Sequence, residues 1–310
     1  MKNLNEYIKE SLLDDFDVLD QRTDDNIRET VLDWIKANFT YYSGLRVSDK
    51  PNKDGLFEAN AKYLQPNSNS KSLTNGMFVW KNVTYDFNCN NCKSLTSLEG
   101  VPKKVGRDFY CNGCDSLKTL NDAPKKVGRD FYCSDCKSLT SLEGAPEELD
   151  GIFDCSRCDS LKTLEGVPEK VGGSFYCNNC DLLKTLEGAP KEVRGDFYCN
   201  NCDSLKTLEG APEEVGGSFY CNHCKSLISL KGAPKEVGGD FCCQYCDSLK
   251  ILKGAPKKVS GSFYCHYCKS LTSLEGAPKE VRGNFYCRYC DSLASYELPS
   301  ATKIKGELIK

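Results

Sequence analysis

The stretch RGDFYCNNCDSLKTLEGAPEEVGGSFYCNHC, residues 194–224, contains two C-x-x-C pairs with eighteen residues between them. The same pair occurs ten times, from Cys89–Cys92 to Cys287–Cys290, and each begins 22 residues after the one before. Of the 21 cysteines, Cys242 alone lies outside this series. An uninterrupted repeat with a period of 20 to 50 residues indicates a solenoid or a propeller. Because 22 residues is too short for a propeller blade or a helical pair, we expect one strand per coil.

The apolar residues of each unit change their spacing along the repeat. Phe109 and Cys111 alternate with Asp108 and Tyr110, which is the period of a strand with one buried face. After the second cysteine, two leucines follow at intervals of three residues, and then a Gly-Ala-Pro or Gly-Val-Pro turn. The residues beyond this turn contain further glycines, which disfavour a helix on the far side of the coil.

The pattern F-x-C-x-x-C-x-x-L-x-x-L resembles the leucine-rich repeat L-x-L-x-x-N/C-x-L-x-x-L in its cysteine-containing form, from about residue 83 to 310. The resemblance implies that Phe109 and Cys111 point inward from a strand and that Cys114 takes the Asn or Cys ladder position. Phe and Cys at positions that are usually aliphatic, with a non-helical convex side, suggest a slender, gently curved solenoid. We predict a mostly β, leucine-rich-repeat-like solenoid of ten 22-residue coils, with one parallel strand each and a small α+β N-terminal cap.

Coils of this size bury too little apolar surface to be stable alone, so both ends of the array need caps. We divide the chain into a leader or docking helix (1–20), an N-terminal helix and capping region (21–82), the ten-repeat solenoid (83–296) and a C-terminal cap (297–310). The C-terminal cap contains Pro299, Ile304 and Leu308, which echo the Pro, Val and Phe positions of the repeat.

The N-terminal capping region contains one helical pattern and two strand-like segments. An amphipathic helix is expected from Asp24 to Phe39. The segments 39–47 and 76–83 are expected to be strands. The residues expected in the cap core are Ile27, Val31, Trp34 and Ile35 from the helix and Phe78, Val79, Trp80 and Val83 from the second segment.

The cysteine pairs allow three interpretations. Their C-x2-C-x18-C-x2-C spacing lies within the range of four-cysteine zinc sites, and stacked coils could also be joined by disulfides. However, the spacing matches at every junction between units and therefore specifies no partner, and the first cysteine occupies a core strand position. Two files of buried, reduced thiols are therefore favoured. We expect no cofactor, with zinc as the alternative.

Two sets of residues on the outer surface are candidates for binding. The residue between Phe and Cys is Tyr in seven of the ten units, which predicts either a self-stacking file or an aromatic binding strip. The two residues inside each C-x-x-C pair vary most, and they become aromatic and basic toward the C-terminus. Tyr and Arg are typical interface anchors, although drift after repeat duplication would give the same pattern. The candidate partner-binding residues are Tyr245, Tyr264, His266, Tyr267, Tyr286, Arg288 and Tyr289.

The first residues, MKNLNEYIKESLLDD, stand apart from the repeats. They resemble the capsid-targeting leaders of internal proteins in large tailed bacteriophages, which are cut after Glu in an [I/L]-x-E site. Ile8 and Glu10 match that site, and Ser11 would become the new N-terminus. The resemblance implies a location in the virion or in the bacterial host cytoplasm, with a capsid or other virion component as a candidate partner. The alternative is an ordinary amphipathic helix that docks on the cap.

Composition and motifs argue against several classes of protein. Lys and Arg number 41 against 44 Asp and Glu, so we expect no nucleic-acid partner, and no apolar stretch is long enough to predict a membrane span. The two histidines lie at variable positions, and no Ser-His-Asp set, phosphate loop or H-E-x-x-H motif occurs. We therefore expect a non-enzymatic module that presents its strand face to a protein partner. The alternatives are a zinc-binding or redox-active thiol protein and a purely structural spacer.

Overall fold

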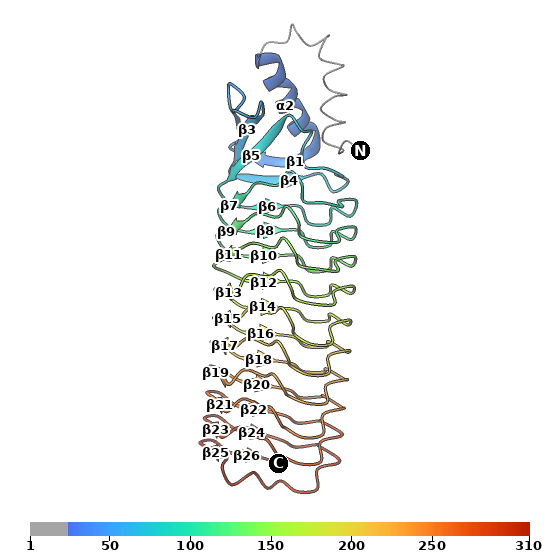
Figure 1. The fold of residues 1–310 in the computed structure, drawn as a ribbon, viewed down its shortest axis with the longest axis vertical. Helices are drawn as coiled ribbons and strands as arrows, with labels where there is room; N and C mark the ends of the chain where they lie inside the picture. The colour runs from blue at the N-terminus through green and yellow to red at the C-terminus, as the bar shows by residue number, and fades with distance from the viewer. Residues whose placement is uncertain (1–23) are drawn as a thin grey trace.

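The computed structural model describes residues 24–310, which form a long column of stacked coils with a small cap at its N-terminal end (Figure 1). The cap contains helix α2 (Asp24–Asn38), which buries Val31 and Ile35 against the cap strands. Ile27 and Trp34 of the same helix are partly buried against the core, as the helical pattern predicts. None of the helices formed by residues 24–310 has the length and apolar character needed to span a membrane.

The cap strands lead from antiparallel pairing into the parallel pairing of the column. They are β1 (Phe39–Ser43), β2 (Arg46–Val47), β3 (Phe57–Ala61), β4 (Tyr63–Pro66) and β5 (Phe78–Val83). Strands β1 and β4 pair antiparallel, as do β2 and β3, whereas β4 pairs parallel with the first coil and β3 with β5. The predicted segments 39–47 and 76–83 are strands, but β3 and β4 were not predicted.

One residue of strand β5 that was predicted to lie in the cap core is exposed. Phe78, Trp80 and Val83 are buried, whereas Val79 is 38% exposed. The prediction that Val79 belongs to the cap core is wrong because side chains alternate between the two faces of a strand.

Each coil adds one short strand to a 13-stranded sheet that runs the length of the column. After β1 and β4, the strands of this sheet are β6 (Phe87–Asn88), β8 (Phe109–Tyr110), β10 (Phe131–Tyr132), β12 (Phe153–Asp154), β14 (Phe175–Tyr176), β16 (Phe197–Tyr198), β18 (Phe219–Tyr220), β20 (Phe241–Cys242), β22 (Phe263–Tyr264), β24 (Phe285–Tyr286) and β26 (Leu308–Ile309). Pairing is parallel and without slippage, so that Phe109 lies opposite Phe131 and Phe285 opposite Leu308. The predicted parallel solenoid of 22-residue coils is confirmed.

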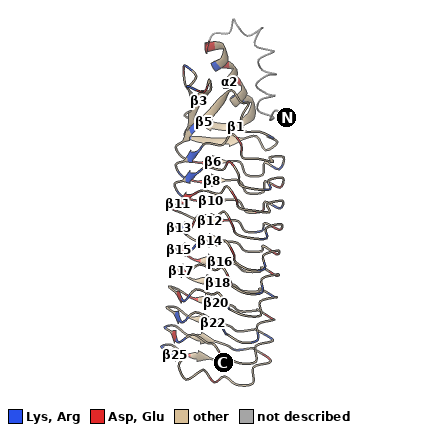
Figure 2. Ribbon diagram, viewed as in Figure 1, with Lys and Arg blue, Asp and Glu red and all other residues tan. Residues whose placement is uncertain are grey.

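Each coil also contributes a second short strand, which the sequence analysis did not anticipate. These strands are β7 (Lys104–Val105), β9 (Lys126–Val127), β11 (Glu148–Leu149), β13 (Lys170–Val171), β15 (Glu192–Val193), β17 (Glu214–Val215), β19 (Glu236–Val237), β21 (Lys258–Val259), β23 (Glu280–Val281) and β25 (Lys303–Ile304). They form two sheets, one from β11 back to β2 and one from β13 to β25. Residues of both charges follow this edge of the column (Figure 2). Ile304 lies opposite Val281, at the valine position predicted for it.

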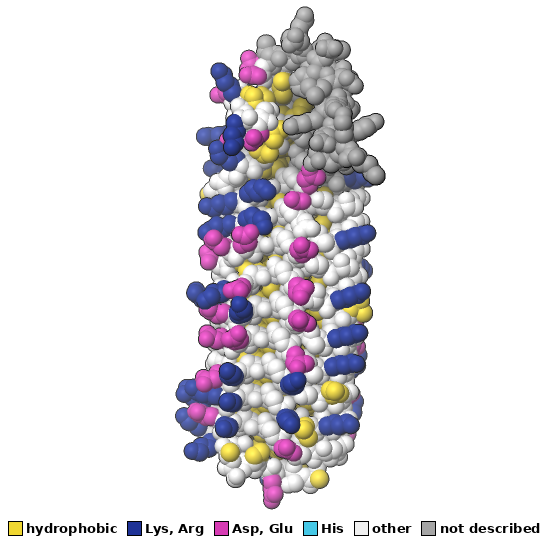
Figure 3. Space-filling model, in the orientation of Figure 1, with side chains coloured by type: hydrophobic (Ala, Val, Ile, Leu, Met, Phe, Trp, Pro, Cys, Tyr) yellow, Lys and Arg dark blue, Asp and Glu magenta, His cyan; other side chains and the backbone are white. Residues whose placement is uncertain are grey.

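The core consists of files of identical side chains along the column. The repeated Phe residues, both cysteines of nearly every pair and the paired leucines have almost no exposed surface. Successive Phe rings are nearly parallel, with centroids 4.9–5.4 Å apart. This distance is close to the spacing of about 4.8 Å between neighbouring strands, so each ring stacks on the next. Charged side chains form files on the outside of the column (Figure 3).

Candidate functional site

The cysteine files connect each coil to its neighbours through sulfur hydrogen bonds. The Sγ–H of Cys114 donates to the carbonyl oxygen of Cys89 at 3.2 Å. The same bond occurs at all nine steps between successive pairs, at 3.1–3.3 Å. The first cysteine of most pairs donates a hydrogen bond to the next coil, as Cys155 does to the carbonyl oxygen of Tyr176 at 3.3 Å. The thiols therefore fill the core and donate hydrogen bonds between coils.

The environment of most of the thiols favours their protonated form. All 21 cysteines are buried and free of disulfides. Burial raises the pKa of Cys202 and of Cys268 to about 12, because the interior disfavours a thiolate. Within residues 24–310, no three or more His, Cys, Asp or Glu side chains are grouped in a way that could hold a metal ion.

The turn inside each C-x-x-C pair has a backbone conformation that L-residues with large side chains rarely adopt. The second of the two intervening residues has a positive φ of 55–66° in every coil. In coil order these residues are Asn91, Gly113, Asp135, Arg157, Asn179, Asn201, His223, Tyr245, Tyr267 and Tyr289. Gly, Asn and Asp tolerate this left-handed region and His is enriched there, whereas other residues lose about 1–2 kcal/mol. The last four coils therefore place bulky rings where most earlier coils have tolerant residues.

The rings at these left-handed positions stack on one another. The centroids of His223 and Tyr245 are 4.4 Å apart, those of Tyr245 and Tyr267 are 4.6 Å apart, and those of Tyr267 and Tyr289 are 4.8 Å apart. The interplanar angles are 5°, 6° and 17°. Tyr245 is 36% exposed and Tyr289 is 54% exposed, so the edges of this stack face solvent.

His266 joins this stack to the outward tyrosines of the main sheet. Its ring makes edge contacts with Tyr267 at 5.3 Å and Tyr245 at 6.0 Å on one side, and with Tyr264 at 6.1 Å and Tyr286 at 6.4 Å on the other. Tyr264 and Tyr286 stack on each other at 4.6 Å.

Arg288 completes this group of residues, with its guanidinium 5.4 Å from the ring centroid of Tyr289. The structure thus brings all seven candidate partner-binding residues together, and we call them the aromatic surface. His223 extends it by one coil. His223 is not among the candidate residues predicted from the sequence, although it occupies the same offset within its C-x-x-C pair as the tyrosines.

The aromatic surface interrupts a polar ladder that runs through earlier coils. The Oδ1 atoms of Asn90 and Asn178 accept the backbone N–H of the equivalent residue in the next coil, at 2.8 and 2.9 Å. This ladder ends at Gln244, whose Oε1 is buried and has no hydrogen-bond partner among residues 24–310. The same holds for Nδ1 of His266. Burial, with a smaller effect from Arg288, lowers the pKa of His266. The last coils therefore have aromatic contacts in place of the side-chain-to-backbone hydrogen bonds.

The outward tyrosines of earlier coils form the self-stacking file that was one of two interpretations of their repeat. Tyr198 stacks on Tyr176 at 4.5 Å and on Tyr220 at 4.6 Å, and its hydroxyl donates to Asp196 at 2.9 Å. Burial raises the pKa of several of these tyrosines, because it disfavours the phenolate. The leader residues Ile8, Glu10 and Ser11 lie outside the described residues.

Comparison with known proteins gives a likeness of low similarity to a solved structure. No protein-family model matches the chain, and no curated protein matches it. Among solved structures, a leucine-rich repeat protein from Bacteroides ovatus is similar, with 16% sequence identity over 84% of this chain and 89% of that chain and a TM-score of 0.34. The solenoid architecture described above rests on the strand pairing of this chain itself.

Proposed function

We propose that this protein is a non-enzymatic binding module that holds a protein partner on its aromatic surface. The observation that carries the proposal is the occupation of a left-handed backbone position by three tyrosines and a histidine in four successive coils. Residues in sparsely populated conformations tend to gather at functional sites, where the surrounding structure maintains them. Repeat solenoids also present extended surfaces that suit protein partners.

The composition of the aromatic surface supports the same function. Tyr and Arg are enriched among the residues that dominate binding energy at protein interfaces. Stacked rings are already ordered, so binding a partner through Tyr267 and Tyr289 would cost little further side-chain conformational entropy. Arg288 adds a cation beside an exposed ring, in reach of carbonyl or carboxylate groups on the partner.

The test compares two double variants of the full chain. Tyr267→Asn/Tyr289→Asn gives the last two coils the residue found at Asn179 and Asn201 in the fifth and sixth. The control, Leu182→Ser/Ile228→Thr, removes side chains that are 43% and 51% exposed elsewhere. It introduces the Ser that the other units carry at the first position and the Thr found at the second in Thr96, Thr140 and Thr272.

Both variants and the unmodified chain are used to capture proteins from the source cells, and each captured protein is purified and titrated against all three. We expect a partner whose Kd rises at least tenfold with the tyrosine variant and stays within twofold with the control. A partner bound equally by all three would exclude the aromatic surface as its site. If no protein is captured reproducibly, the spacer alternative is favoured.

We also propose that the chain is carried in a phage virion, on the resemblance of its first residues to capsid-targeting leaders. Ile8 and Glu10 would then direct cleavage before Ser11. Mass spectrometry of the protein from purified virions should find Ser11 at the mature N-terminus. Recovery of the intact Met1 form from that material would exclude processing at this site.

A further inference from the structure

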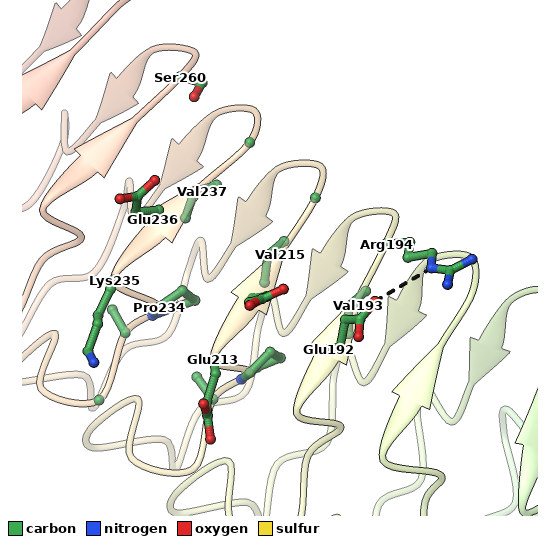
Figure 4. Close-up of a pocket in the computed structure, with 17 residues that line it drawn as sticks. Glu192, Val193, Arg194, Glu213, Val215, Pro234, Lys235, Glu236, Val237 and Ser260 are labelled. Atoms are coloured by element: carbon green, nitrogen blue, oxygen red, sulfur yellow. Dashed lines mark ion pairs between the residues drawn. The ribbon is translucent and has the colours of Figure 1, made fainter.

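A second surface lies beside the second sheet, away from the aromatic surface. A hollow of about 850 Å³ extends along the column over β15, β17 and β19 (Figure 4). The residue after the strand valine is Gly216 in one coil and Gly238 in the next, between the side chains of Arg194 and Ser260. Two successive coils without a side chain at this position leave the hollow open.

Part of the lining of the hollow is apolar. Ala211 and Ala233, from two successive Gly-Ala-Pro turns, line it and are half-buried. The equivalent alanines of earlier coils, Ala123 and Ala145, are 2% and 4% exposed. The solenoid therefore exposes apolar surface here that it covers in those coils.

The strands beside this hollow carry three glutamates in register. Glu192 lies opposite Glu214, and Glu214 lies opposite Glu236. At most other steps of this file the neighbours have opposite charges, although Lys104 and Lys126 are also alike. Like charges directly opposite each other on adjacent strands destabilise a sheet. Two consecutive pairs of adjacent strands beside the hollow therefore have like charges opposite each other, which is unfavourable.

Glu214 is the least compensated of the three glutamates. Glu192 pairs with Lys170 at 2.6 Å and with Arg194 at 3.5 Å, and Glu236 pairs with Lys258 at 3.4 Å. Within residues 24–310, Glu214 has no ion pair. Its carboxylate would gain most from a cation supplied by another molecule.

We infer that this hollow, the acidic groove, is a docking site for an extended segment of a partner protein that carries lysine or arginine. Four carboxylates line the hollow against two cations, Arg194 and Lys235, so charge complementarity selects this occupant. A basic side chain at Glu214 would relieve both like-charged steps at once. Apolar parts of the segment would cover Ala211 and Ala233. The site is independent of the aromatic surface, so a solenoid with both could hold two partners or two parts of one.

The repeat of the column also suggests the spacing of the basic residues. Two coil steps, from Glu192 to Glu236, span about 10 Å. A segment in the polyproline II conformation rises about 3.1 Å per residue with three residues per turn, so basic residues three positions apart would lie on the same side and match this span. The expected ligand is therefore a Lys- or Arg-rich segment with a spacing of three.

The test is selection of displayed random twelve-residue peptides on the full chain. Enriched peptides are then titrated against the unmodified chain, Glu214→Lys and Glu187→Lys. Glu187→Lys makes the same change in net charge at an exposed position outside the groove. We expect enriched peptides with paired basic residues whose Kd rises at least tenfold with Glu214→Lys and less than threefold with Glu187→Lys.

Thermal unfolding of the same variants separates lost binding from lost folding. Glu214→Lys places a cation between Glu192 and Glu236, so its unfolding midpoint should equal or exceed that of the unmodified chain. The inference is overturned if no peptide is enriched, if enriched peptides lack basic residues, or if both variants weaken binding equally. Peptides that lose affinity with Tyr267→Asn instead would belong to the aromatic surface and would also overturn it.

Discussion

The Sγ–H of Cys180 donates a hydrogen bond to the carbonyl oxygen of Cys155, one coil earlier, at 3.3 Å. The backbone hydrogen bonds of residues 24–310 leave this carbonyl without an N–H donor. Cysteine suits the position because its small apolar side chain fills the core and still carries a weak donor. Repetition of this contact from coil to coil gives a structural reason for the 22-residue cysteine spacing.

Removal of this donor should destabilise the solenoid. Cys180→Ala leaves the Cys155 carbonyl buried without its partner and a small cavity beside it. We expect the free energy of unfolding, measured with urea under reducing conditions, to fall by about 1–3 kcal/mol. Cys180→Ser keeps a donor and should lose less than Cys180→Ala. Equal stability of the Ala variant and the unmodified chain would show that the sulfur hydrogen bond contributes nothing measurable.

The buried thiols also predict how stability depends on pH. The pKa of Cys202 and of Cys268 is raised to about 12 in the folded chain, against about 8.5 for a thiol in the unfolded chain. Because the folded pKa is the higher one, the two buried thiols contribute fully to the free energy of unfolding below about pH 8.5. This contribution is lost as pH rises toward 12. At pH 10 each such thiol costs up to about 2 kcal/mol of stability.

Many thiols share this environment, so we expect cooperative alkaline unfolding above about pH 9. Circular dichroism and thiolate absorbance near 240 nm, followed together under reducing conditions, should change over the same pH range. Thiolate absorbance that develops below pH 9 while the circular dichroism stays native would contradict this prediction.

The fold was largely predictable from the sequence because the period never varies. A strict 22-residue spacing places Phe109 opposite Phe131 without any choice of register, and the interior files follow from it. The second strand of each coil was not predictable, because two residues such as Lys104–Val105 are too short to show a period. Val79 was misplaced because a run of apolar residues does not reveal which of them face inward.

The aromatic surface was predictable as a set of residues, whereas the acidic groove was not. The residues inside the C-x-x-C pairs are variable in the sequence, and their shared offset brings them together on adjacent coils. The groove forms where Gly216 and Gly238, in successive coils, lie beside the file of glutamates that includes Glu214. Because that juxtaposition requires the second sheet, the sequence alone gave no sign of it.

Two glycines with a positive φ, Gly188 in a Gly-Ala-Pro turn and Gly55 in the cap, should differ strongly in the stability that an alanine substitution costs. Gly188 has a φ of +87°, and a Cβ there would overlap the backbone of Glu165 in the previous coil. Gly55 has a φ of +76°, and a Cβ there would meet nothing within 4 Å. We expect Gly188→Ala to lower the free energy of unfolding by about 3 kcal/mol or more and Gly55→Ala by about 1 kcal/mol.

The comparison of these two alanine variants isolates the effect of coil stacking, because both share the strain of a left-handed residue. Urea unfolding of each should give the two values directly. If both variants lose the same stability, the coils can separate locally at the turn, and the tight stacking beside Gly188 does not limit substitution.

The two tyrosine files should respond differently to the same substitution. Tyr198 and Tyr267 each stack on two neighbouring rings, at 4.5 and 4.6 Å and at 4.6 and 4.8 Å. Tyr198→Asn loses both stacking contacts and the hydrogen bond to Asp196, so we expect a loss of about 2–3 kcal/mol. Tyr267→Asn loses similar stacking but relieves a φ of +58°, where Asn is tolerated, so its loss should be smaller by about 1 kcal/mol.

Urea unfolding of the two variants measures this difference in stability. Titration of the partner against the same variants tests whether Tyr267 contributes to binding. If Tyr267 is retained for binding, Tyr267→Asn should lower the free energy of unfolding by only about 1–2 kcal/mol while it weakens the partner complex. Tyr198→Asn should reduce stability and leave partner affinity within about threefold. A loss of stability at Tyr267 as large as that at Tyr198 would indicate that the left-handed stack is part of the structural framework, and the strained backbone would then no longer argue for a binding function.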